Sequence, residues 1–89
     1  MLREPMTLIN RLGLHARAAS KLVQTATRFE AEIWLEREHR RVSAKSIMGV
    51  LMLAAPVGTE LVLETDGPDE QAAMKALIEL IADRFGEDE

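Results

Sequence analysis

The stretch GLHARAASKLVQTAT, residues 13–27, places a histidine between a glycine and a run with helical periodicity. The apolar residues of this run recur at the spacing of one helical face, at Ala16, Ala19, Leu22, Val23 and Ala26. The polar residues Arg17, Lys21, Gln24 and Arg28 stand elsewhere. The stretch therefore predicts an amphipathic helix over residues 16–27, with His15 at or just ahead of its first turn.

The rest of the chain alternates between strand-like and helix-like patterns. Short apolar or alternating runs predict strands at residues 6–10, 31–37, 41–43 and 60–65. Ser46 precedes a short helix over residues 47–53, in which Gly49 costs about 1 kcal/mol relative to alanine. A last helix opens near Pro68 and ends at Gly86. Its buried stripe is expected to be Met74, Leu77, Ile78, Ile81 and Phe85.

This element order, βαββαβα, predicts an α+β fold. We expect an open-faced β-sandwich, in which a four-stranded antiparallel sheet carries three helices on one face. Residues 1–89 form a single domain, because no linker, repeat or low-complexity segment divides them. Only the acidic tail GEDE is expected to fray. Hydrophobic residues make up 47% of the chain and aromatic residues 3%, so the core should be aliphatic.

Charge and composition exclude several functional classes. A net charge of −4 and an isoelectric point near 5.2 argue against a nucleic-acid partner, which needs a basic face. The N-terminus lacks the apolar core of a signal peptide, and the longest apolar run, IMGVLMLAAPVG, is too short to span a bilayer. The chain has no cysteine, which is compatible with a reducing compartment. We therefore expect a cytoplasmic protein without a membrane partner.

His15 is the candidate for chemistry. At a helix N-terminus several backbone N–H groups lack partners, and the positive end of the helix dipole favours an anion. A phosphoryl group on the imidazole would face the amides of Ala16, Arg17 and Ala18, and the Arg17 side chain could add a charge-assisted contact. Gly13 allows a sharp turn before the histidine. The stretch predicts a transient phosphohistidine, although a polar helix cap would explain a single histidine equally well.

Other chemistries find little support in the sequence. No His, Cys or carboxylate residues stand at metal-ligand spacing, and His39, in a charged hairpin, is expected to be solvated. An enzyme that uses His15 as a base would need a second catalytic group, and none is evident. An α+β RNA-binding domain would need an aromatic platform, which the sequence lacks.

Two motifs decide between these readings through their resemblance to a known family. GLHARAAS (13–20) is similar to the active-site signature of HPr, the histidine-containing phosphocarrier of the bacterial phosphoenolpyruvate-dependent phosphotransferase system. SAKSIMGVL (43–51) resembles the family's second signature, and GTELVLETDGPDEQAAM (58–74) resembles its last strand and helix entry. The resemblance covers nearly the whole chain and implies the same open-faced fold.

The resemblance also implies a function. His15 would accept a phosphoryl group on Nδ1 from phosphorylated enzyme I and pass it to an acceptor domain of the IIA type, with Arg17 contacting the group. The protein would then be a carrier rather than an enzyme, without a cofactor or metal, and a monomer. Residues expected to bind partners are Ser20, Gln24, Lys45, Ile47, Met48 and Met52.

Ser46 matches the serine that HPr kinase/phosphorylase modifies in many members of the family. A phosphate there would sit at a helix N-terminus and repel an acidic partner surface. A helix-capping role alone would explain the same serine.

The sequence also departs from the family pattern. Ala18 stands where the motif usually has proline, and Gln24, Thr27 and Gly49 stand at positions that are often basic in sugar-transport members. Fewer cations near His15 would weaken docking on an acidic partner. A second interpretation therefore stays open, in which the protein is a regulatory binding module of a nitrogen-type branch, gated by phosphorylation.

Overall fold

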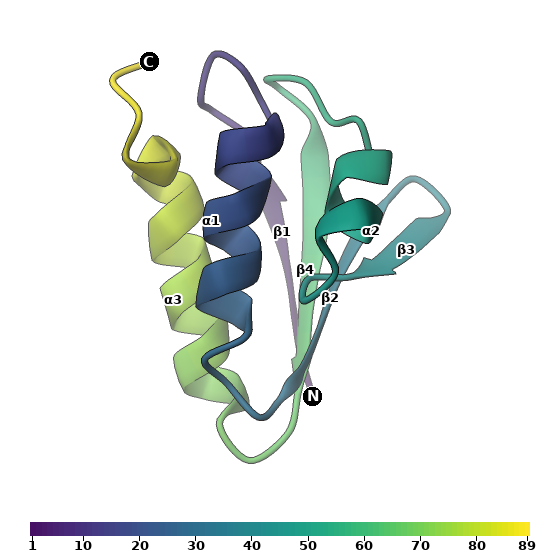
Figure 1. Cartoon of the computed structure of the whole chain (residues 1–89). Helices are drawn as coiled ribbons and strands as arrows, with labels where there is room; N and C mark the ends of the chain where they lie inside the picture. The colour runs from purple at the N-terminus through teal and green to yellow at the C-terminus, as the bar shows by residue number, and fades with distance from the viewer.

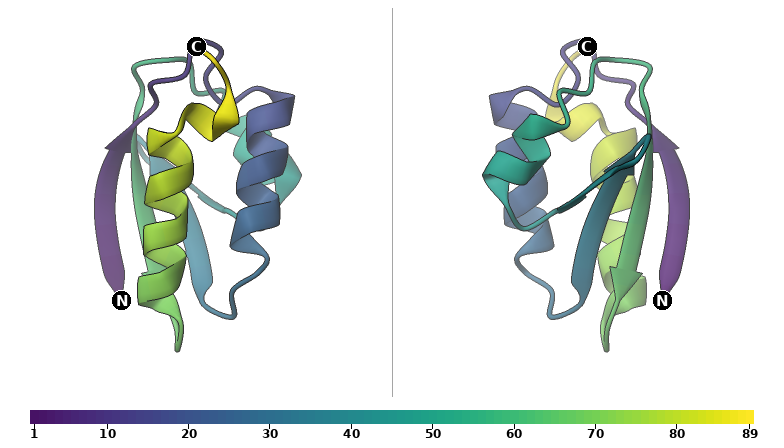
Figure 2. Two further views of the ribbon diagram at one scale, coloured as in Figure 1. Left: turned by 90° about the vertical axis from the view of Figure 1, so that its left-hand side faces the viewer. Right: turned by 90° about the vertical axis from the view of Figure 1, so that its right-hand side faces the viewer.

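The computed structural model describes residues 1–89 and confirms the predicted order of elements and fold class. The elements are β1 (Leu2–Thr7), α1 (Ala16–Ala26), β2 (Glu32–Arg37), β3 (Arg40–Ser43), α2 (Ile47–Met52), β4 (Glu60–Asp66) and α3 (Glu70–Ala82), followed by a short 3₁₀ turn, η1 (Arg84–Gly86). The helices gather on one face of the sheet and leave the other face uncovered (Figures 1 and 2). No helix has the length and apolar character that crossing a membrane requires.

The sheet has four antiparallel strands in the order β1-β4-β2-β3. Along the two central strands, β4 and β2, side chains alternate between the buried face and the uncovered face of the sheet, as expected for a sheet covered on one side. Their inward residues Ile33, Leu35, Leu61 and Leu63 are fully buried, and Trp34 lies on the outer face with Glu64. The pairing register of β2 and β4 is therefore fixed, because a slip by one residue would move these apolar side chains from the core face to the solvent-exposed face.

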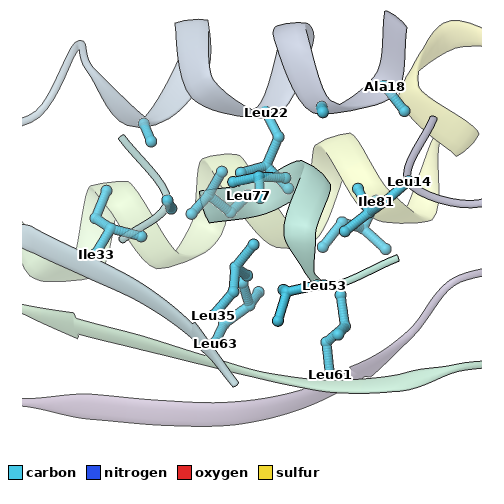
Figure 3. Close-up of a cluster of buried hydrophobic side chains, with 14 of the residues drawn as sticks. Leu14, Ala18, Leu22, Ile33, Leu35, Leu53, Leu61, Leu63, Leu77 and Ile81 are labelled. Carbon is cyan, nitrogen blue, oxygen red and sulfur yellow. The ribbon is translucent and has the colours of Figure 1, made fainter. Parts of the chain in front are cut away.

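The core lies between this sheet and the helices (Figure 3). Leu22 from α1 and Leu77 and Ile81 from α3 meet the inward side chains of the sheet. Each fully buried leucine or isoleucine contributes about 1.5–3 kcal/mol, so this layer supplies most of the driving force for folding. Ala18, Ala19 and Ala26 are also fully buried, as expected for a small aliphatic core.

The short helix α2 is held at both ends by side chains. At its start, the Ser46 hydroxyl accepts the amide of Gly49 at 3.1 Å, which confirms the predicted N-cap. At its end, Arg40 donates to the Met52 carbonyl at 2.8 Å, and Arg37 donates to the carbonyls of Leu53 and Ala54. These contacts satisfy carbonyl groups that a helix terminus leaves unpaired, and they offset the cost of a glycine within the helix.

The first strand differs from its prediction at residues 6–10. It runs over Leu2–Thr7 and pairs only with β4, so it is an edge strand. Pro5 suggested that the strand begins after it, but a proline is tolerated at an edge because its missing N–H is not needed there. The predicted residues beyond Thr7 form the approach to α1 instead.

The C-terminal segment also differs from its prediction. Helix α3 ends at Ala82, and Phe85, predicted on its buried stripe, lies beyond the helix and is still buried. Arg84, Phe85 and Gly86 all have positive φ angles, 55°, 56° and 77°, so the chain reverses in a left-handed turn. Burial of the Phe85 ring offsets the strain of that conformation. The following residues are held by hydrogen bonds, so the expectation of a frayed tail is wrong.

The uncovered face of the sheet carries a compact polar network. The Glu64 side chain, only 8% exposed, pairs with Arg3 at 2.7 Å and with Arg41. The Arg41 guanidinium also lies 4.2 Å from the centroid of the Trp34 ring, a cation–π contact. Burial alone would raise the pKa of Glu64, but hydrogen bonds from Arg41 and Arg3 bring it below its usual value. Trp34 therefore covers this ion pair on the open face.

Candidate functional site

His15 is the N-cap residue of α1, with extended backbone angles of φ −78° and ψ 177°. The chain reaches it through Gly13, whose φ of +65° is the left-handed conformation that favours glycine. A Cβ atom at Gly13 would lie 2.4 Å from the carbonyl oxygen of Ala55. That same oxygen accepts the amide of Leu14 at 2.9 Å, and the Leu14 side chain is buried in the core. The loop before His15 is therefore fixed on the segment that follows α2.

The two nitrogens of the His15 ring have different partners. Nδ1 lies 3.3 Å from the amide nitrogen of Arg17 and accepts its hydrogen. Nε2 lies 2.5 Å from Oε2 of Glu87, and an ionised carboxylate can only accept a hydrogen bond. The hydrogen-bond partners therefore assign the proton to Nε2 and leave the lone pair on Nδ1. Nδ1, which carries this lone pair, faces the N-terminus of α1.

The backbone around Nδ1 offers further donors. The first helical amide to bond to a backbone carbonyl is that of Ala19, which donates to the His15 oxygen at 2.8 Å. The amides of Ala16 and Ala18 donate to no protein atom, as expected for the first turn of a helix. The structure thus brings together the backbone groups that the sequence predicted for holding an anion.

The Arg17 side chain is exposed and makes no hydrogen bond or ion pair with the protein. It lines an open hollow together with Arg11, Lys21 and residues 86–89. Arg11 pairs with Glu89 and Lys21 donates to the Phe85 carbonyl, so Arg17 is the cation of this hollow that remains without a partner beside the helix N-terminus.

Glu87 is a site residue that sequence reasoning missed. Its Oε1 accepts the side-chain amide of Asn10 at 3.0 Å, and its Oε2 pairs with His15. Burial opposes ionisation of Glu87, but hydrogen bonds from Asn10 and His15, with the charge of Arg17, hold its pKa below the usual value. His15 and Glu87 are 72 positions apart, so no local sequence pattern predicts their contact.

Five of the six residues predicted to bind partners fall into two groups. Ile47, Met48 and Met52 are 40%, 65% and 59% exposed, and together they form the apolar patch on α2. Ser20 and Gln24 lie on α1, where the Gln24 amide donates to the Ser20 hydroxyl.

Lys45 is separated from the histidine. Its Nζ donates to the Phe29 carbonyl at 2.7 Å, and Phe29 follows the end of α1, whereas His15 precedes the start of that helix. Lys45 therefore ties the start of α2 to the far end of α1. No group of three or more histidine, cysteine or acidic side chains is placed to hold a metal ion, and His39 is exposed in the β2–β3 turn.

The fold is thus a small open-faced sandwich that presents an imidazole at a helix N-terminus, beside an open hollow. The chain matches the family model PTS-HPr, the PTS HPr component phosphorylation site, over residues 2–83. It therefore belongs to the HPr family, the phosphocarrier proteins of the phosphotransferase system, which are carriers rather than catalysts.

Individual relatives agree over the full length of the chain. It is 60% identical to the phosphocarrier protein HPr of Cupriavidus necator and 54% identical to that of Neisseria meningitidis, with all of each chain covered. The crystal structure of an HPr from Thermoanaerobacter tengcongensis superposes with a TM-score of 0.97 at 43% identity, again over all of both chains.

Proposed function

We propose that this protein accepts a phosphoryl group on Nδ1 of His15 from phosphorylated enzyme I and passes it to a IIA-type acceptor. The observation that carries the proposal is the assignment of the His15 ring, with its proton on Nε2 beside Glu87 and its lone pair on Nδ1 beside α1. Nδ1 is then the nitrogen free to attack phosphorus without first losing a proton.

In this step the Nδ1 lone pair forms a bond to phosphorus as the bond between phosphorus and the donor atom of enzyme I breaks. The electron pair of that bond leaves with the donor. Nε2 keeps its proton, so the phosphorylated ring carries a positive charge. Transfer to the acceptor reverses the sequence, because an acceptor atom attacks phosphorus and the electron pair of the N–P bond returns to Nδ1.

The first turn of α1 would hold the phosphoryl oxygens. The free amides of Ala16 and Ala18, and that of Arg17 after it turns from Nδ1, can donate to them. The exposed Arg17 guanidinium can add a charge-assisted contact. Ala18 contributes an N–H that a proline would lack, so this departure from the family pattern adds a donor.

The apolar patch on α2, formed by Ile47, Met48 and Met52, is the surface we assign to partner docking. Exposed methionines suit this task because their flexible side chains fit partners of different shape. The end of α2 leads directly into the segment that binds the loop before His15, through the bond between Leu14 and Ala55. The segment that follows α2 thus connects the apolar patch to the loop that precedes His15.

Regulation at Ser46 is a further part of the proposal. Its residue is exposed, and its hydroxyl faces the amide of Gly49 at the start of α2. A phosphate there would interact favourably with the helix N-terminus and add about −1.5 to −2 charges next to Ile47 and Met48. An acidic partner surface would then be repelled from the apolar patch.

The test is intact mass spectrometry after incubation with phosphoenolpyruvate and enzyme I. We expect one acid-labile phosphoryl group on the native chain and on His39→Ala, the matched control at the second histidine, and none on His15→Ala. Enzyme I proteins from a sugar-type and a nitrogen-type system, run in parallel, assign the branch. Absence of phosphorylation of the native chain by both would refute the carrier function and leave a binding module.

A further inference from the structure

We propose that Glu87 is a positioning residue for phosphoryl transfer, which holds the His15 ring in its reactive tautomer and stabilises the charge that the ring gains. This inference rests on the carrier function proposed above and deepens it. It concerns the C-terminal tail, residues 86–89, a segment that the helical pattern of the sequence leaves out.

Three structural features bring the tail close to the histidine. The left-handed turn at Arg84–Gly86 reverses the chain, and the buried Phe85 ring anchors that turn in the core. Lys21 on α1 donates to the Phe85 carbonyl at 2.6 Å, which brings the turn beside the first helix. Figure 2 shows the C-terminus at the end of the molecule where α1 begins, beside the loop that leads into this helix, and Arg11 in that loop donates its amide to the Glu89 carbonyl. Glu87 thus arrives from a structured turn.

The orientation of the Glu87 carboxylate is fixed by Asn10. The Asn10 side chain is fully buried, and its amide nitrogen donates to the Gly13 carbonyl at 2.8 Å and to Glu87 Oε1 at 3.0 Å. A flipped amide would place an oxygen against both acceptors, so only one orientation is possible, even though Asn10 Oδ1 finds no partner. One carboxylate oxygen is therefore held by Asn10, and the other is left for His15.

The chemistry of the pair follows from charge. Before transfer, the carboxylate of Glu87 favours the tautomer with the proton on Nε2 and the lone pair on Nδ1. After transfer, the ring is a cation whose remaining N–H points at that carboxylate, so the hydrogen bond becomes charge-assisted on both sides. A buried carboxylate beside a catalytic histidine plays the same two parts in hydrolases. The Glu87 side chain is 11% exposed, so water screens the interaction little.

The measurement compares Glu87→Gln with the native chain and with Glu89→Gln. Glutamine keeps the size of the side chain and removes its charge. Glu89 belongs to the same tail and pairs with Arg11 at 2.6 Å, but it does not contact His15, so it is the matched control. Circular dichroism and thermal unfolding of all three proteins establish that they are folded.

Two readouts separate positioning from a structural role. Steady-state kinetics with enzyme I, with this protein as the varied substrate, should give a kcat about tenfold lower for Glu87→Gln, as expected for one charge-assisted hydrogen bond. KM should be unchanged because Glu87 lies outside the apolar patch. Nitrogen-15 NMR of the unphosphorylated ring should show a smaller fraction protonated only on Nε2. Glu89→Gln should match the native chain within about twofold in kcat.

The inference is overturned if Glu87→Gln gives the native kcat, the native KM and the native ring spectrum. A native chain that enzyme I does not phosphorylate would instead refute the carrier function. In that case the ring spectrum, measured without enzyme I, still decides whether Glu87 sets the tautomer of His15.

Discussion

Gly13 supports the loop that presents the histidine, and its replacement by alanine should be unusually costly. Its φ of +65° is left-handed, and a Cβ atom would lie 2.4 Å from the Ala55 oxygen and 2.8 Å from Pro56 Cα. The conformation alone costs an L-residue about 1–2 kcal/mol. Both clashing atoms belong to the backbone, so the two segments must separate, which weakens the bond from Leu14 to Ala55 and adds about 2 kcal/mol.

Gly58 provides the matched control for this estimate. Its φ of +88° carries a comparable conformational cost, but a Cβ atom there would meet nothing within 4 Å. Urea unfolding of the native chain, Gly13→Ala and Gly58→Ala should give losses in unfolding free energy of about 3–4 kcal/mol and about 1–2 kcal/mol, respectively. Equal losses would show that contact with Ala55 contributes nothing, and the explanation of this loop would be wrong.

Two further perturbations test the fold around the site. Folding lowers the pKa of Glu64, Asp69, Glu70 and Glu87, so each group adds stability above its unfolded pKa and loses it as pH falls through the folded one. Thermal unfolding should therefore show a lower midpoint below pH 4.5, with a shallower decline in Glu64→Gln, and a midpoint independent of pH there would contradict these contacts. Phe85→Ala should cost about 3–5 kcal/mol in urea unfolding, because the ring is buried and anchors the tail. A loss below about 1 kcal/mol would mean that the turn holds the tail without the ring.

Much of the fold could be predicted from the sequence because its signals are local. The spacing of apolar residues placed α1 correctly to within one residue at its end, and Ser46 marked the start of α2. Alternation identified the central strands, whose inward residues form the core. The first strand was misplaced, because Pro5 reads as a break unless the strand is known to lie at an edge. Edge position is a property of the assembled sheet.

Only the part of the site that lies within one stretch of sequence, His15 and the first turn of α1, could be predicted. Helix spacing brought His15 together with the amides of the first turn, and the structure places them so. The contacts of Glu87 with His15 and Asn10 connect opposite ends of the chain, and an acidic tail without apolar periodicity resembles a solvated end. Partner binding by Lys45 stays a prediction, and its hydrogen bond to the Phe29 carbonyl is a long-range contact that its position in the sequence does not indicate.

Because β1 pairs with β4, the site around His15 is assembled only when the whole domain folds. The loop before His15 rests on residues 55–59: Leu8 exchanges backbone hydrogen bonds with this segment, and Leu14 donates to Ala55. These contacts join distant parts of the chain, which must meet before the loop has a support. An isolated helix of 11 residues is marginal in water, so α1 alone would not preserve the site. A partly folded chain therefore lacks the arrangement of His15 and the first turn of α1 that the proposed phosphoryl transfer requires.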